Sequence, residues 1–163
     1  MALKINPDYL RSTVFGFQDA LVSTTGIVVG ISAGVDNKQF ILLSALVTIS
    51  VEALSMGAGQ YLSEKTVHEL PQNRHRDDLL TGGLIMFISY LLGGLVPIVP
   101  VIFSTPPLNS ILSIIFAFIG LFSLGFIKAK LFQGKVWRSA LEMLTIGGLA
   151  TFIGLLVGII FKI

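Results

Sequence analysis

The chain has 163 residues, of which 53% are hydrophobic and only 12% are charged, whereas a soluble domain carries about 25% charged residues. With a mean hydropathy of +0.87 and a formal charge of only +2, this composition excludes a soluble enzyme, a disordered tail and a nucleic-acid-binding protein. The absence of cysteine also excludes disulfides, thiolate metal sites and cysteine nucleophiles.

Five apolar stretches are each long enough to cross a bilayer, which takes about 20 mostly apolar residues. Backbone groups in hydrocarbon must form hydrogen bonds within their own segment, so these stretches are predicted to be helices. We therefore predict an all-α integral membrane protein in which residues 1–163 form one transmembrane domain within the lipid bilayer. The predicted helices are, in chain order, Val14–Gly34, Phe40–Ser63, Leu79–Phe103, Leu108–Ile127 and Ser139–Phe161.

The polar segments outside these helices are short. Met1–Ser12 lacks the basic region, short apolar core and cleavage site of a signal peptide, so the first helix is expected to remain in the mature protein. Glu64–Asp78 is the one sizeable predicted loop and carries most of the charge outside the membrane. Pro97 and Pro100 in the third helix are expected either to bend it and free carbonyls along a polar path, or to bend it without functional consequence.

Lysine and arginine residues predict the orientation in the membrane. Cytoplasmic segments carry an excess of these residues, so the side with more of them is expected to be inside. With the N-terminus in the cytoplasm, only Lys38 and Lys162 are outside, and the C-terminus lies outside too. The basic residues on the inner side are then Lys4, Arg11, Lys65, Arg74, Arg76, Lys128, Lys130, Lys135 and Arg138.

Three carboxylates fall inside the predicted helices, namely Asp19, Glu52 and Glu142. A charge in the bilayer core costs a few kcal/mol even on lenient insertion scales, so such a residue is a candidate for function. Glu142 follows Arg138 by one helical turn at the membrane surface. An ion pair between the two side chains explains why a charged residue is present at position 142. Asp19 and Glu52 lie deeper and have no basic residue nearby in the sequence.

We predict that these two acids belong to a polar ladder between the first two helices. Glu52, Met56 and Gln60 recur every four residues and share one face of the second helix, as Asp19 and Ser23 do on the first. If the two helices are antiparallel neighbours, Asp19 lies between Met56 and Gln60 in depth. Oxygen ligands bind divalent cations, and a thioether among them favours transition metals. The alternative is a protonated acid that forms a structural hydrogen bond between helices.

A second group of metal-binding residues follows the second helix. Glu64 and His68 would share a face if that helix continued, and together with Glu69 they could collect metal at the mouth of the pathway. The alternative is that these side chains are solvated loop residues.

Small residues recur in the first helix at Gly26, Gly30 and Gly34. Such a pattern lets helix backbones approach closely and often marks a dimer contact. The same pattern occurs at Gly154 and Gly158 in the fifth helix, and packing within one chain explains it equally well.

Four stretches resemble the vacuolar iron transporter family, in the same order along nearly the whole chain. The stretches are FGFQDALVSTTGIVVG, VEALSMGAGQYLSEKT, YLLGGLVPIVP and LGFIKAKLFQGKVWRSALEMLTIGGLATFIGLLVG. The resemblance implies five spanning helices, a cytoplasmic N-terminus, a homodimer and export of Fe²⁺, or in some members Mn²⁺, in exchange for protons. It implies that Asp19 and Met56 bind metal, and it matches Glu52 to an acid of the second helix.

The chain departs from this family in two respects. Gln60 stands where members often have a glutamate, so it can coordinate through its carbonyl but cannot carry a proton. Only Glu64–Asp78 stands where many members have a Glu-rich metal-binding domain, which removes the basis for cytoplasmic metal storage and weakens the expectation of Fe²⁺.

We therefore expect a transporter that exports a divalent transition metal, with Asp19 and Met56 as ligands and Glu52 as a ligand or proton carrier. No motif of an enzyme active site is present, and no cofactor is expected, because the metal ion and protons are substrates. Two alternatives are a membrane scaffold that does not transport and a passive pore for cations or protons. The small size suggests a prokaryotic cell membrane.

Overall fold

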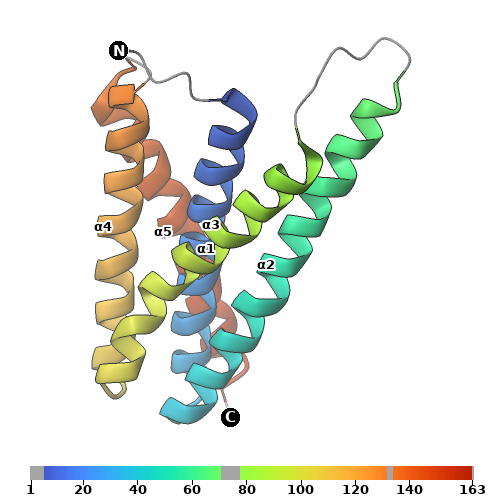
Figure 1. Ribbon diagram of the computed structural model, residues 1–163. Coiled ribbons are helices and arrows are strands. Elements are labelled where there is room, and N and C mark those ends of the chain that lie inside the picture. The colour runs from blue at the N-terminus through green and yellow to red at the C-terminus, as the bar shows by residue number, and fades with distance from the viewer. Residues whose placement is uncertain (1–5, 71–77, 132–133, 163) are drawn as a thin grey trace.

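The computed structural model describes residues 6–70, 78–131 and 134–162, and this part of the chain is helical except for short connections. Each of the helices is long and apolar enough to span a membrane, as the sequence predicted. They alternate in direction, so that the N-terminus and the C-terminus lie at opposite ends (Figure 1). The helices are α1 (Pro7–Gly34), α2 (Lys38–His68), α3 (Leu79–Phe103), α4 (Leu108–Leu131) and α5 (Val136–Ile160).

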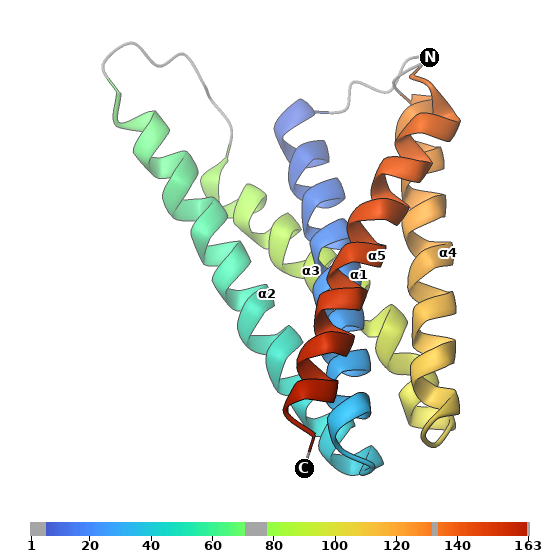
Figure 2. The same ribbon diagram turned by 180° about the vertical axis from the view of Figure 1, so that it is seen from behind.

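Helix α1 lies at the centre of the bundle. It packs extensively against α3 and α5 and only lightly against α2. Helix α2 packs mainly on α3, and the end of α2 near His68 leans away from the other helices in both views (Figures 1 and 2). The first two helices are therefore less close than their short connection suggested, because α3 contacts both of them.

Several helices extend further than predicted. Asn6 caps α1 by accepting a hydrogen bond from the Asp8 backbone N–H at 2.9 Å, so this helix begins seven residues earlier. The prediction of a loop from Glu64 was wrong for residues 64–68, which continue α2. Polar residues at a membrane surface can continue a helix, because water hydrates their side chains while the backbone hydrogen bonds of the helix are kept. Lys4, Arg74 and Arg76 lie outside the described residues.

The glycines of α1 pack against α5 of the same chain. A Cβ atom added to Gly30 would lie 2.7 Å from the Gly154 carbonyl oxygen, and one on Gly34 would lie 3.0 Å from the Gly158 carbonyl oxygen. A Cβ on Gly26 would meet the Ala150 carbonyl oxygen at 3.3 Å. The structure thus uses this face for contacts within one chain, which is the alternative to the dimer contact that we expected there.

Helix α1 approaches α3 just as closely as it approaches α5. A Cβ on Gly93 would lie 2.6 Å from the Phe17 carbonyl oxygen, and one on Gly16 would lie 2.9 Å from the sulfur of Met86. Pro97 of α3 is buried, and its carbonyl accepts a hydrogen bond from the Ser113 hydroxyl of α4 at 2.6 Å. The α3 backbone near the prolines is thus bonded to a neighbouring helix at this point.

Basic residues gather at one end of the bundle. The ends of α2 and α4 and the start of α5 lie together with the N-terminus, and they carry Lys65, Lys128, Lys130, Lys135 and Arg138 (Figure 1). As predicted, the Arg138 Nε atom pairs with the Glu142 carboxylate at 2.9 Å.

The distribution of basic residues predicts the labelling of single cysteines in this cysteine-free chain. Lys65→Cys at the end of α2 should react with a membrane-impermeant maleimide only from the cytoplasmic side, and Lys162→Cys beyond α5 only from the opposite side. Both lysines are exposed, so reactivity reports the side of the membrane rather than burial. Labelling of position 65 in intact cells, with protection of position 162, would reverse the orientation.

The close approach of α1 and α5 predicts that Gly30→Ala destabilises the fold, since the added methyl group meets the Gly154 backbone. The expected loss is about 1–3 kcal/mol, typical of overpacking, and it should appear as a lower thermal midpoint in detergent. Gly59→Ala is the matched control, because a Cβ at Gly59 meets nothing within 4 Å and alanine favours helices by about 1 kcal/mol. Equal midpoints for the two variants would contradict the α1–α5 contact.

Candidate functional site

Asp19 and Glu52 lie in the same part of the bundle. Each side chain is partly exposed, with Asp19 on α1 and Glu52 on α2, and the two carboxyl groups lie near enough to interact electrostatically. Two like charges at this depth repel each other, so a proton or a cation between them lowers the energy of the site.

Tyr90 of α3 joins the two helices at this point. Only 1% of its surface is exposed. Its hydroxyl donates a hydrogen bond to the Glu52 carboxylate and shares another with the Ser23 hydroxyl, with 2.7 Å between the oxygens. The sequence analysis missed Tyr90. Its signal was a tyrosine in the middle of a spanning helix, whereas tyrosine usually lies at the membrane surface.

Met56 packs beside this polar group. It contacts a buried cluster formed by Ala20 of α1, Ala53 of α2 and Tyr90 of α3. Its thioether is therefore one helical turn from Glu52 on the same face of α2.

The depths of the ladder residues differ from the prediction. Arg11 of α1 pairs with Glu64 of α2, and Ser23 is linked to Glu52 through Tyr90. This antiparallel register puts Asp19 level with Met56 rather than between Met56 and Gln60. The prediction was off by about half a turn because it matched helix ends that were set several residues too short.

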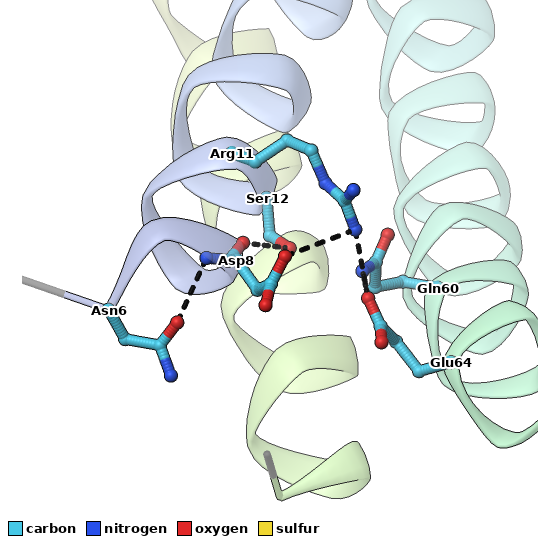
Figure 3. A network of polar contacts seen from close by, with 6 residues as sticks. All are labelled: Asn6, Asp8, Arg11, Ser12, Gln60 and Glu64. Atoms are coloured by element: carbon cyan, nitrogen blue, oxygen red, sulfur yellow. Dashed lines mark hydrogen bonds and ion pairs between the residues drawn. The ribbon is translucent and has the colours of Figure 1, made fainter. Parts of the chain in front are cut away.

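Gln60 belongs to a separate network nearer the membrane surface, drawn in Figure 3. Its Nε2 atom donates to the Glu64 carboxylate at 2.9 Å, and Arg11 contacts the same carboxylate oxygen at 2.9 Å and Asp8 at 3.7 Å. The Gln60 Nε2 atom is thus bonded to Glu64, one helical turn further along α2.

This surface network closes the space beneath it. The side chain of Glu64 is only 12% exposed, and the cavity that it lines with Asp8, Ser12 and Gln60 has a volume of about 10 Å³. A space of this size holds at most about one water molecule.

The other residues predicted to collect metal do not gather at one point. Glu64 is engaged by Arg11 and Gln60. His68 is partly buried, and its Nε2 atom has no hydrogen-bond partner among the described residues, while Glu69 is exposed at the end of α2. Within the described part of the chain, no group of three or more His, Asp or Glu side chains could hold a metal ion.

The interior group offers a mixed set of ligand atoms. The place where three helices come together holds two carboxylates, the hydroxyl groups of a tyrosine and a serine, and a nearby thioether. Carboxylates provide charge for a divalent cation, and a thioether favours softer transition metals. The same carboxylates can exchange protons, so the group can bind either kind of cation.

These features define a multi-pass integral membrane protein with a polar site inside its helical bundle. The model of the VIT family matches residues 10–80 and 67–159. The chain belongs to this family of membrane transporters, as its motifs predicted. It is also similar to "Vacuolar iron transporter homolog 3" of Arabidopsis thaliana, with 26% identity over 157 residues that cover 87% of this chain and 78% of the relative.

The bonds of Tyr90 predict that Tyr90→Phe destabilises the bundle, because Glu52 and Ser23 lose a buried partner. The expected loss is about 1–3 kcal/mol, measured as a fall in the thermal midpoint in detergent. Tyr61→Phe is the control, since the Tyr61 hydroxyl bonds to none of the described residues. A midpoint for Tyr90→Phe as high as that of Tyr61→Phe would show that the bridge adds no stability.

Proposed function

We propose that this protein carries a divalent transition-metal ion, Fe²⁺ or Mn²⁺, out of the cytosol in exchange for protons. Membership of the VIT family supports transport across a membrane, and the name of the plant relative refers to iron. The observation that carries the proposal is the presence of Asp19 and Glu52 in the same part of the bundle, beside Tyr90 and Met56.

The metal ion would bind between Asp19 and the Met56 thioether, which the register brings to the same depth. A divalent ion that leaves water must recover its hydration energy from its ligands, and anionic oxygens do this far better than neutral ones. The sulfur would favour Fe²⁺ and Mn²⁺ over Mg²⁺ or Ca²⁺, which prefer oxygen alone.

Glu52 would carry the proton. Its carboxyl group is hydrogen-bonded to the Tyr90 hydroxyl and would be protonated while no metal ion is bound. Arrival of a metal ion at Asp19 would favour release of that proton, because a nearby positive charge stabilises the carboxylate anion. This coupling would distinguish an antiporter from a passive pore.

Access from the cytoplasm would require the surface network to open. The ion pair of Arg11 with Glu64 would separate, so that the space beneath it admits an ion. We also propose a homodimer, with its contact surface outside the α1 face that α5 covers.

Flux measurements in liposomes test the ligand assignments. Asp19→Asn keeps the size of the side chain and removes its charge, so initial Fe²⁺ and Mn²⁺ flux should fall at least about tenfold while the fold is kept. Glu142→Gln is the matched control, because this acid pairs with Arg138 at the surface and should leave flux unchanged. Equal flux in the two variants would remove Asp19 from the pathway, and a protein without metal flux in any form would be a scaffold.

Two further variants separate metal choice from proton coupling. Met56→Leu keeps the volume and removes the sulfur, so Fe²⁺ and Mn²⁺ should lose their advantage over Mg²⁺ in competition assays. Glu52→Gln cannot titrate, so metal flux should no longer change the internal pH recorded alongside it. An unaltered metal ranking and unaltered proton movement would contradict these two roles, and metal flux without proton movement in the wild type would indicate a passive pore.

A further inference from the structure

A hollow lies between the end of α4 and the start of α5, at the end of the bundle that holds the N-terminus. Its volume is about 460 Å³, and basic side chains line it at Lys128, Lys135 and Arg138. All three are exposed. The end of α4 and the start of α5 lie side by side at this end (Figure 2).

The charge in this hollow is not balanced. Glu142 is the one acid that lines it, and its carboxylate contacts the Nε atom of Arg138. The terminal nitrogens of Arg138 remain available as donors, and neither Lys128 nor Lys135 has an ion pair within the described residues. Lys135 also precedes α5, whose first turn has no side-chain cap, so the positive end of the helix dipole adds to the field.

An apolar groove adjoins this hollow. It has a volume of about 340 Å³ and runs along α1, where Leu10, Val14 and Phe15 line it. Lys128 is among the residues that line each of the two spaces. A cationic hollow beside an apolar groove at a membrane surface matches a molecule with an anionic head and a hydrocarbon chain.

We propose that an anionic phospholipid binds here, with its phosphate on Lys128, Lys135 and Arg138 and an acyl chain along α1. Arginine and lysine form strong hydrogen bonds with phosphate oxygens. Basic clusters at the cytoplasmic ends of spanning helices attract anionic lipids. The bound lipid would join α1, α4 and α5 on one side of the bundle. This inference does not depend on which ion the protein transports.

The single tryptophan of the chain provides a direct measurement. Trp137 adjoins Arg138, is 72% exposed and has its ring centroid 6.0 Å from that of Phe122. The full-length protein in phosphatidylcholine vesicles is titrated with phosphatidylglycerol that carries brominated chains, which quench tryptophan fluorescence on contact. Brominated phosphatidylcholine is titrated in parallel, and phosphatidylglycerol should quench at lower mole fraction.

Paired variants test whether the hollow itself is the site. Lys128→Gln with Lys135→Gln should weaken the relative binding of phosphatidylglycerol by roughly fivefold for each cation removed. Lys65→Gln with Lys130→Gln removes the same charge from residues that line neither space, and it should change binding by less than about twofold. Lys135→Gln alone should lower binding about fivefold. Lys135 lies outside the helices, so this single variant should fold and keeps the test valid if the double variant misfolds.

Three results would overturn the proposal. Equal losses in the two double variants would mean that diffuse surface charge attracts the lipid. Equal quenching of the wild type by both brominated lipids would mean that no anionic lipid is selected. Full recovery of fluorescence on addition of inorganic phosphate, at constant ionic strength, would identify a site for free phosphate.

Discussion

The close approach of α1 to two neighbouring helices is the constraint on which the rest of the structure depends. A bilayer provides no hydrophobic force that drives helices together, so association relies on contact between backbones. Gly16 and Gly93 bring α1 against α3, and Gly30 and Gly154 bring it against α5. Because these contacts are made through backbone atoms, they leave little freedom for α1 to rotate or slide, and the position of Asp19 is thereby set.

The interior polar group combines stability and function in the same atoms. Tyr90 donates to Glu52 and is bonded to Ser23, so three helices are joined through one hydroxyl. A fully bonded structural group would leave no charge to be neutralised, yet Asp19 adds a second carboxylate without a basic partner among the described residues. We propose that this second acid makes the group a cation site rather than a hydrogen-bonded link between helices.

The charged residues at the end near the N-terminus have two different arrangements. Between α1 and α2, Arg11 and Glu64 neutralise each other over a nearly closed cavity. Between α4 and α5, Lys128 and Lys135 face an open hollow without partners in the described chain. The first arrangement holds its charges in an ion pair, whereas the second leaves charge available to a ligand from the membrane.

The sequence by itself determined the five spanning helices, the separation of basic residues to one end, the Arg138–Glu142 pair and the membership of the family. Each of these depends on local hydrophobicity, spacing along one helix or motif order, which are written in the chain. Only the tertiary structure decided that α5 covers the glycines of α1, that Tyr90 joins Glu52 to Ser23, and that Arg11 and Gln60 bond to the same Glu64 oxygen. Those outcomes depend on the relative depth and rotation of separate helices. The apolar residues that cover each helix give no local signal for its depth or its rotation relative to the others.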